Sequence, residues 1–302
     1  MNFIKTCKYV VVISISRSIA KFTLSMMKKN SIHFNNLLLS FWNVDGLYFN
    51  DYDSRQCKLD DPDVSDFLVK HNIICLAETH CGYSDNPSLP GFSKPVQNIR
   101  NKSPTAKKHY GGLAVFIKES IKKGIKFEPI TNSEYIWFKL DKFFFNMEKD
   151  IYVCVLYISN SSFAENNVDV FECVETDAAK FSRDGSNLLF CGDINGYTGC
   201  IPDYCIEDGN ILSSDSDFYI PYVQDIPLKR NNLDVRKTNP RGDNFLDLCK
   251  ACKVRILNGR FLGDTLGNFT CFSHTGAPST IDYMAASVDL LSSIKTLFKT
   301  MI

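Results

Sequence analysis

Polar side chains that could do chemistry follow several strand-like apolar runs in this chain. Asn43, Glu78 and the pair Asp193 and Asn195 each stand at or just past the end of such a run. Ligands in α/β proteins gather at strand ends, so carboxylates and amides placed there can converge. Glu78 offers the hard oxygen ligand that Mg²⁺ prefers. Asp193 and Asn195 are two residues apart and point the same way in an extended chain, so one could orient a water and the other a phosphate oxygen.

Each of these motifs also has a purely structural interpretation. Residues 43–46 and 193–196 are both turn-like sequences, because Asp, Asn and Gly favour turns. Glu78 could cap the segment that follows it. Taken singly, these interpretations are favoured. Taken together, in order and each after an apolar strand, the motifs predict a hydrolytic site.

The elements that must position these residues form a strand-rich framework. Nine runs dominated by β-branched and aromatic residues predict strands at 37–44, 73–77, 113–118, 135–140, 151–158, 188–191, 254–257, 269–272 and 280–285. Helical spacing predicts helices after Asp61-Pro62, over 168–181 and over 245–252, the last following Gly242. Many strands with few helices favour two packed sheets covered by helices.

Composition narrows the class of protein. The chain has 302 residues and 44% hydrophobic residues, which suits a folded globular protein. Basic and acidic residues both number 34, so nucleic-acid binding would need a local basic patch. Residues 1–34 contain six basic residues and no acid. We expect 1–34 to be a basic extension outside the fold, with a transit or signal segment as the alternative, and 35–302 to form one domain.

Two groups of basic residues could supply such a patch. They are Arg100, Lys102, Lys107, Lys108, Lys118, Lys122, Lys123 and Lys126, and then Lys229, Arg230, Arg236, Lys237 and Arg241. Among them we predict nucleic-acid contacts at Lys107, Lys108, Lys118 and Arg230. The alternative is an ordinary solvated surface.

Twelve cysteines could indicate a secreted disulfide scaffold, but several lie inside apolar runs, as reduced core cysteines do. Cys249 and Cys252 form a lone CxxC pair without a good second pair of zinc ligands. On a helix this spacing favours two small hydrophobic residues on one face. No run is long and apolar enough to predict a membrane span.

The motifs, in their order along the chain, resemble those of the endonuclease/exonuclease/phosphatase family. The resemblance is specifically to the apurinic-type endonuclease domain of non-LTR retrotransposons, and it covers about residues 38–287. The motifs that carry it begin at Trp42-Asn43-Val44-Asp45-Gly46-Leu47, Leu76-Ala77-Glu78-Thr79, Tyr110-Gly111-Gly112-Leu113 and Gly192-Asp193-Ile194-Asn195, and continue at Asn258-Gly259-Arg260, Gly267-Asn268-Phe269-Thr270 and Ser279-Thr280-Ile281-Asp282-Tyr283.

The resemblance implies an α/β (α+β) fold of two stacked, mostly antiparallel β-sheets flanked by helices in a four-layer sandwich. It implies hydrolysis of a phosphodiester in DNA with Mg²⁺, or Mn²⁺ as the alternative, by Lewis-acid and general-base help. No membrane partner and no stable protein partner are implied, and the cytoplasm or the nucleus is the expected compartment.

The resemblance also assigns roles to individual residues. Glu78 would bind the metal, and Asp193 would orient the attacking water. Asn195 and Asn43 would hold the phosphate or a metal-bound water. Tyr157 would lie beside the leaving phosphate, and Asp282 would pair with a catalytic histidine.

One departure from the family pattern concerns its closing Ser-Asp-His, which this sequence lacks. His80 and His274 lie in loops near the motifs, but loop histidines more often face solvent. We therefore expect a C-terminally truncated domain with its last strand missing, a sheet edge left unpaired and impaired nicking. The alternatives are a non-catalytic remnant and a phosphodiesterase or phosphatase acting on another phosphoester. No reverse-transcriptase Tyr-x-Asp-Asp motif is present to prove the retrotransposon context.

Overall fold

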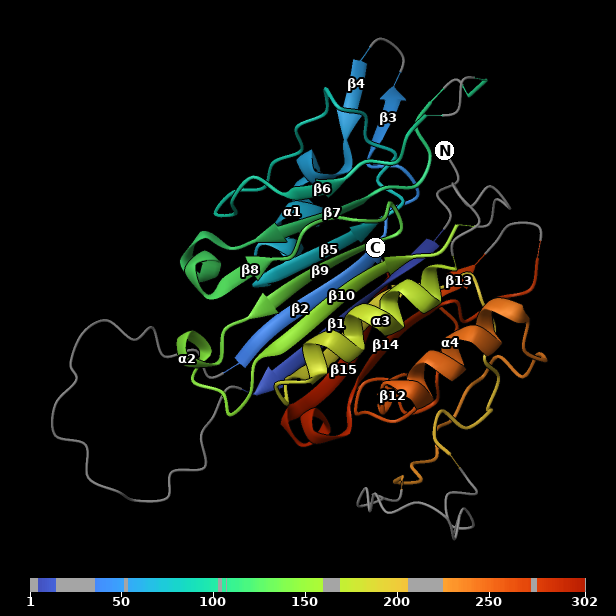
Figure 1. The fold of residues 1–302 in the computed structure, drawn as a ribbon. Helices are drawn as coiled ribbons and strands as arrows, with labels where there is room; N and C mark the ends of the chain where they lie inside the picture. The colour runs from blue at the N-terminus through green and yellow to red at the C-terminus, as the bar shows by residue number, and fades with distance from the viewer. Residues whose placement is uncertain are drawn as a thin grey trace, which may run out of the picture.

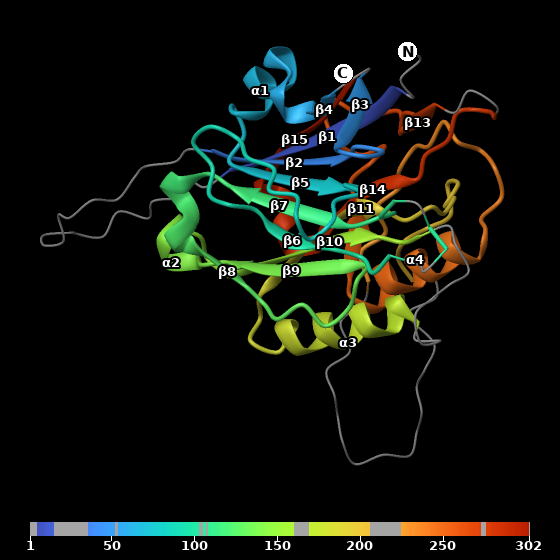
Figure 2. The same cartoon turned by 90° about the horizontal axis from the view of Figure 1, so that it is seen from above.

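Two β-sheets stacked face to face form the centre of the molecule in a computed structural model (Figure 1; Figure 2). The structure describes residues 5–14, 36–51, 54–102, 105–106, 108–159, 169–205, 225–272 and 276–301. The first sheet has the strand order β13-β1-β2-β5-β7-β6, with β15 also paired to β1. These strands are β13 (Cys271–Phe272), β1 (Lys5–Ser14), β2 (Asn36–Asn43), β5 (Ile73–Ala77), β7 (Leu113–Ile117), β6 (Val96–Asn98) and β15 (Ile294–Met301).

The second sheet has the order β12-β14-β11-β10-β9-β8. Its strands are β12 (Val254–Ile256), β14 (Asp282–Ser287), β11 (Asn187–Asp193), β10 (Ile151–Tyr157), β9 (Tyr135–Leu140) and β8 (Ile125–Phe127). Among the described strands, only the pairs β2–β5 and β10–β11 are parallel, so the sheets are mostly antiparallel, as predicted. A separate hairpin joins β3 (Tyr48–Asp51) to β4 (Ser54–Cys57).

Helices cover the outer faces of both sheets. α1 (Pro62–Leu68) lies on the first sheet, and α3 (Val170–Ser182) and α4 (Pro240–Ala251) lie side by side on the second (Figure 2). The shorter elements are α2 (Lys142–Phe145) and the 3₁₀ helices η1 (Lys58–Asp60), η2 (Glu119–Gly124) and η3 (Val288–Ser293). No helix in the described ranges combines the length and the apolar character needed to cross a bilayer.

Three separate hydrophobic clusters account for the four layers. Side chains that alternate along both sheets, such as Phe41 and Val153, fill the space between the sheets. The opposite faces pack against helices: Leu76 against α1, and Phe190 against α3 and α4. Cys249 belongs to the last of these clusters, as expected for a core cysteine. The predicted four-layer sandwich is therefore confirmed.

The helix starts follow local capping chemistry. The Asp61 carboxylate accepts hydrogen bonds from the amides of Asp63 and Val64, with Pro62 in the first turn of α1, as the sequence predicted. Asn239 caps α4 in the same way and Pro240 follows it. α4 therefore begins before Gly242, five residues earlier than the predicted start at 245.

The expectation for the N-terminal segment was wrong for residues 5–14. β1 pairs along its length with β2, and on its other edge with β15 and β13. Tyr9, Val11 and Ile13 are buried in the core between the sheets. The continuous apolar run from Tyr9 to Ile13 is buried on both faces of the strand, which allows it to lie inside the sheet. β1 thus covers the edge of β2 that faces away from β5.

Candidate active site

The polar ends of three adjacent strands form a row at one edge of the second sheet. β10 and β11 run parallel with Tyr157 opposite Asp193, and antiparallel β14 places Asp282 opposite Asp193. Asp193 is 1% exposed and Asp282 is 3% exposed, so both carboxyl groups are withdrawn from bulk water. Three of the predicted site residues therefore meet through strand register alone.

The first sheet, on the opposite side of the sandwich, contributes Asn43 and Glu78 to the site. Parallel pairing places Asn43 opposite Ala77, and Glu78 follows immediately. The Asn43 side-chain amide donates a 2.7 Å hydrogen bond to Asp193 Oδ2 and thereby joins the two sheets. The backbone amide of Asn195 donates to Asp193 Oδ1 at 2.9 Å, which fixes the carboxylate from its other side. The six predicted catalytic and metal-binding residues, Asn195 included, thus lie in one site.

Left-handed backbone conformations are concentrated at this site. Six non-glycine residues in the described chain have positive φ, and four of them are Asp45, Glu78, His80 and Asn195. Such conformations are costly for residues with a Cβ and cluster where function requires a fixed geometry. The strand ends therefore turn sharply here, and the turns hold the polar side chains at the junction of the sheets.

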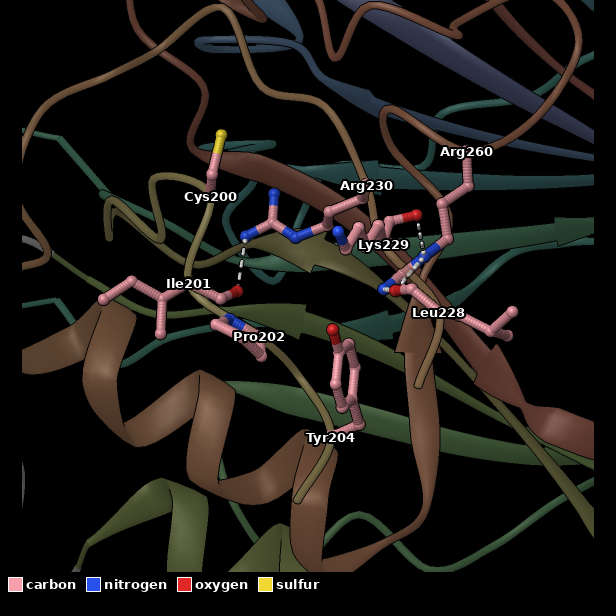
Figure 3. A pocket seen from close by; sticks show the side chains of 8 residues that line it. All are labelled: Cys200, Ile201, Pro202, Tyr204, Leu228, Lys229, Arg230 and Arg260. Atoms are coloured by element: carbon pink, nitrogen blue, oxygen red, sulfur yellow. Dashed lines mark hydrogen bonds between the residues drawn. The ribbon is translucent and has the colours of Figure 1, made fainter. Parts of the chain in front are cut away.

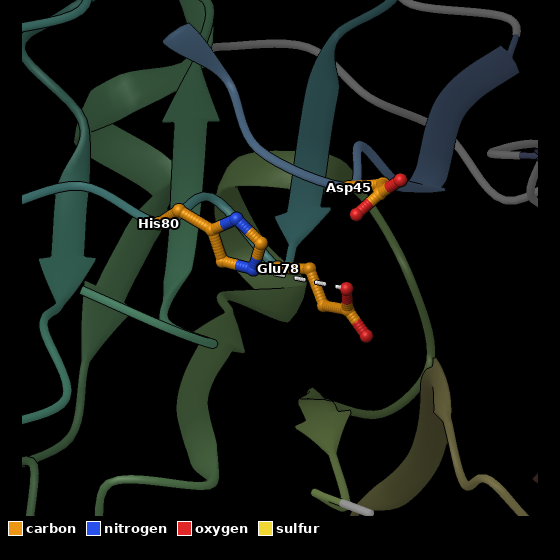
Figure 4. A group of neighbouring side chains, drawn as sticks. All are labelled: Asp45, Glu78 and His80. Carbon is orange, nitrogen blue, oxygen red and sulfur yellow. Dashed lines mark ion pairs between the residues drawn. The ribbon is translucent and has the colours of Figure 1, made fainter. Parts of the chain in front are cut away.

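Two members of the site were not assigned from the sequence. Asp45 had been interpreted as part of a turn, and His80 as a solvent-facing loop residue. One ligand atom from each of Asp45, Glu78 and His80 lies within 4.8 Å of the others (Figure 4). The interpretation of His80 was wrong, since its side chain is only 12% exposed. A usable signal was present: Asn43 and Asp45, Glu78 and His80, and Asp193 and Asn195 all repeat the same spacing of two residues.

Four carboxyl groups lie at the site, and the negative charges of some of them disfavour the ionised forms of others. Burial, together with the negative charge of Asp45, raises the pKa of Glu78, although hydrogen bonds from Tyr157 and Asn43 oppose the shift. Burial and the charges of Asp282 and Glu78 raise the pKa of Asp193 well above its ordinary value. A group of acids this close cannot all ionise without a compensating positive charge.

This group of acids fits a divalent cation. Asp45 and Glu78 supply carboxylate oxygens, and His80 supplies an imidazole nitrogen, within a span that a small ion can bridge. The buried negative charge nearby explains why a cation would be favoured there. Glu78, Asp45 and His80 are the residues that would hold it, and the ion would supply Lewis-acid polarisation of a phosphoryl oxygen.

His80 does not form a charged pair with Glu78, despite the 3.8 Å separation of Nε2 from Oε2. Burial lowers the pKa of His80 to about 4, and the charge of Lys108 acts in the same direction. The imidazole is therefore neutral at pH 7.

The Tyr157 hydroxyl is held inside the site. Burial raises the pKa of Tyr157, and the charge of Glu78 and the hydrogen bond to its carboxylate reinforce that shift. The hydroxyl therefore remains protonated at neutral pH and can act as a hydrogen-bond donor. Its ring packs closely on the loop before β7, because a Cβ added at Gly111 would lie 2.9 Å from the ring.

Asp282 lacks the partner that the resemblance implied. Its amide donates to Thr270 Oγ1, and its Oδ1 has no hydrogen-bond partner in the structure. No histidine in the described ranges contacts it, and His274 lies outside those ranges. Burial raises the pKa of Asp282 to about 7, although the hydrogen bond with Thr270 and the charge of Lys299 oppose the shift.

We expect the stability of the metal-free chain to fall between about pH 4 and pH 7. The folded state keeps the proton on Asp282 up to about pH 7, whereas the unfolded chain loses it near the ordinary value of 3.8. Raising the pH therefore favours unfolding through this window. Asp282→Asn should reduce this slope and raise the free energy of unfolding at pH 7.5 by more than about 1 kcal/mol. Urea titrations in EDTA at several pH values test this, and an unchanged slope in the variant contradicts it.

The predicted nucleic-acid contacts do not lie together. Lys108 is exposed, with its ammonium 5.0 Å from the ring centre of Tyr110 beside the site. Lys118 follows the far end of β7, away from Glu78, and donates to the Val69 carbonyl. Lys107 lies outside the described residues.

The prediction for Arg230 was wrong. Arg230 is 8% exposed and donates to Thr198 Oγ1 at 2.7 Å, inside a pocket shared with Tyr204 and Arg260 (Figure 3). Burial lowers the pKa of its guanidinium. Arg230 belongs to a basic segment of the sequence, but the loop that follows β11 buries its side chain.

No protein-family model matches this sequence, and a search of curated proteins finds no match. Among solved structures, the chain is similar to the catalytic domain of Xenopus laevis APE2, with 15% identity over 87% of this chain and 91% of that one, at a TM-score of 0.54. The endonuclease domain of TRAS1, a telomere-specific non-LTR retrotransposon, matches with 12% identity over 76% and 79% of the two chains at a TM-score of 0.42. A mannosyl-6-phosphatase of Bacteroides thetaiotaomicron matches with 11% identity over 75% and 76% at 0.36.

The likeness to the APE2 catalytic domain covers most of both chains. At this level of identity it is a statement about the fold. The chain therefore has the fold of the APE2 catalytic domain, and its two stacked sheets flanked by helices are the architecture that the ordered motifs implied.

Proposed function

We propose that this chain is a metal-dependent phosphodiesterase that nicks DNA, of the type found in non-LTR retrotransposons, with Mg²⁺ or Mn²⁺ as its cofactor. One observation carries the proposal. Asn43, Glu78, Tyr157, Asp193 and Asp282 come from five strand ends in two sheets and meet in one buried acidic site. Such a site can hold a cation and a water against a phosphate.

The residues divide the work of hydrolysis. Asp193 accepts hydrogen bonds from Asn43 and from the amide of Asn195, so its carboxylate is fixed in the orientation needed to hold an attacking water. Its raised pKa makes it a better proton acceptor than an ordinary carboxylate. The protonated Tyr157 hydroxyl can donate to a phosphate oxygen. The Asn195 side-chain amide donates to the Ile158 carbonyl, which orients that side chain beside Asp193.

Plasmid nicking tests this function directly. We expect relaxation of supercoiled DNA with Mg²⁺ or Mn²⁺, none with EDTA, and loss of the activity in Glu78→Ala. Glu175→Ala on the exposed face of α3 is the matched control and should nick as the wild type does. A cleavage activity that Glu78→Ala leaves intact would exclude the proposed site. Parallel assays with a phosphomonoester and an inositol phosphate distinguish DNA from other phosphoesters.

We further propose that turnover is slow, because Asp282 Oδ1 has no hydrogen-bond partner in the structure. A missing general acid or base typically costs about 10²–10⁴ in rate. Added imidazole should then accelerate nicking by the wild type in a saturable way, and should not accelerate it in Asp282→Asn. If imidazole leaves the nicking rate of the wild type unchanged, the proposal that turnover is slow for want of a partner to Asp282 is contradicted.

DNA affinity should depend on Lys108 and not on Arg230 or Lys118. Lys108→Gln removes an exposed charge beside the site, so it should weaken binding and reduce the salt slope by about one unit. Arg230→Met removes a buried charge without a carboxylate partner among the described residues, and should leave both quantities unchanged. Fluorescence anisotropy of labelled DNA in EDTA, at several salt concentrations, measures both. If DNA binding by Arg230→Met depended less on salt concentration than binding by the wild type does, Arg230 would be a phosphate contact after all.

A further inference from the structure

The position of His80 is fixed by three loops that meet at the site. The amide of Gly46 donates to the Glu78 carbonyl at 2.7 Å, and the amide of Leu47 donates to the Thr79 carbonyl at 2.9 Å. The amide of His80 itself donates to the Gly111 carbonyl at 2.8 Å. The backbone on either side of His80 is therefore tied to the loop that carries Asp45 and to the loop before β7.

The orientation of the imidazole ring follows from its neighbours. A Cβ added at Gly46 would lie 3.1 Å from Nδ1, so this side of the ring rests against the Asp45-Gly46 turn. The Tyr110 ring packs edge-on at a centroid distance of 5.5 Å. Nε2 then points toward the Glu78 carboxylate, 3.8 Å from Oε2 (Figure 4). No residue in the described part of the chain hydrogen-bonds Nε2, so this nitrogen is directed into the acidic site without a protein partner.

The separations match those of ligands around one small cation. Ligand atoms about 2.1 Å from an octahedral ion are about 3 Å apart when adjacent and about 4.2 Å apart when opposite. The 3.8 Å between His80 Nε2 and Glu78 Oε2 lies within that interval. All three ligand atoms lie within 4.8 Å of one another, so a shift of well under an ångström is enough to bring them around one ion, and the exposed Asp45 side chain can make it.

We infer that His80 binds the metal ion directly through Nε2, alongside Glu78 and Asp45, and that this nitrogen makes the site prefer Mn²⁺ to Mg²⁺. The inference rests on the proposed function, because it concerns the cation of the same site. Mg²⁺ strongly prefers oxygen ligands, whereas imidazole suits first-row transition metals. The two carboxylates alone would suit either ion, so His80 sets the preference.

Electron spin-echo modulation of Mn²⁺ bound to the full chain tests the inference, because it detects a coordinated ¹⁴N nucleus. We expect ¹⁴N modulation in the wild type and its loss in His80→Gln, a variant that keeps the reach of the side chain without the imidazole. Equilibrium titration should show Mn²⁺ affinity falling about 10-fold or more in His80→Gln, with Mg²⁺ affinity changing by about threefold at most. His109→Gln, in the neighbouring loop, is the matched control and should keep the modulation.

The outcomes separate this inference from the proposed function. Mn²⁺ binding that requires Glu78 but shows no ¹⁴N modulation overturns the ligand role of His80 and leaves the metal-dependent function standing. Mn²⁺ binding that Glu78→Gln does not weaken, or no binding at all, overturns both. Equal loss of Mg²⁺ and Mn²⁺ affinity in His80→Gln would overturn the preference for Mn²⁺.

Discussion

Asp193→Asn is expected to lower the rate of metal-dependent DNA nicking by about 10²–10⁴ while the chain stays folded. The amide has nearly the shape of the carboxylate but cannot accept a proton from water. Asn43 and the amide of Asn195 already donate to the two Asp193 oxygens, so an amide nitrogen in either place would face a donor. The productive orientation is lost together with the base.

The same substitution should make the metal-free protein more stable at neutral pH. Asp193 is fully buried beside Asp282 and Glu78, and all three carboxyl groups have raised pKa values. Removing one carboxyl group lowers the free-energy cost of ionising the other two. The melting temperature in EDTA should therefore rise although activity falls. Asp247→Asn on exposed α4 is the matched control for both measurements. A variant that keeps wild-type nicking would remove Asp193 from the mechanism.

Val11→Asp in β1 is expected to have the largest effect on stability. Val11 is fully buried between the sheets, and its strand is paired on both edges. An unpaired carboxylate there should cost more than about 3 kcal/mol, a large share of the roughly 5–15 kcal/mol that stabilises a typical domain. We expect a melting temperature lower by roughly 10 °C, or failure to accumulate as a soluble protein.

Val235→Asp is the matched control, because Val235 is 84% exposed. The change is chemically identical and should shift the free energy of unfolding by less than about 0.5 kcal/mol. Thermal melts and urea titrations of the two variants, made side by side, provide the comparison. If Val11→Asp has the same melting temperature as Val235→Asp, β1 does not belong to the core, and residues 5–14 are an extension outside the fold.

The sequence predicted the framework well because apolar alternation marks strands that are buried on at least one face. All nine predicted runs contain strands of the structure, including the short β13. The long strands β1 and β15 also had no prediction, because residues 1–34 were expected to lie outside the fold and the last strand was expected to be missing. The other strands without a prediction, such as β4 and β8, are short and largely exposed or polar. Short strands of this kind form because they pair with a neighbouring strand, and not because of their own hydrophobic pattern. Local sequence does not reveal which strand that neighbour is.

The site could be predicted in part for a similar reason. Asp193 ends one predicted strand and Glu78 follows another, and the stacking of the two sheets brings these strand ends together. Asp45 and His80 depend on left-handed turns beside Glu78. Asp and His are enriched in that conformation but adopt it rarely, so residue type alone does not place the turns. Arg230 illustrates the reverse problem, since its burial depends on a loop packing that charge alone does not reveal.

The pairing of β1 with β15 has a consequence for biosynthesis. Cys7 and Met301 are register partners, so the first sheet joins segments at opposite ends of the described chain. At about 5–20 residues per second, β15 leaves the ribosome roughly 15–55 s after β1. Contacts between residues so far apart in the sequence form late. Until β15 pairs with β1, the apolar segment Tyr9–Ile13 has one unpaired edge. We expect nascent chains to need a chaperone during this interval, because an unpaired apolar strand is a template for aggregation.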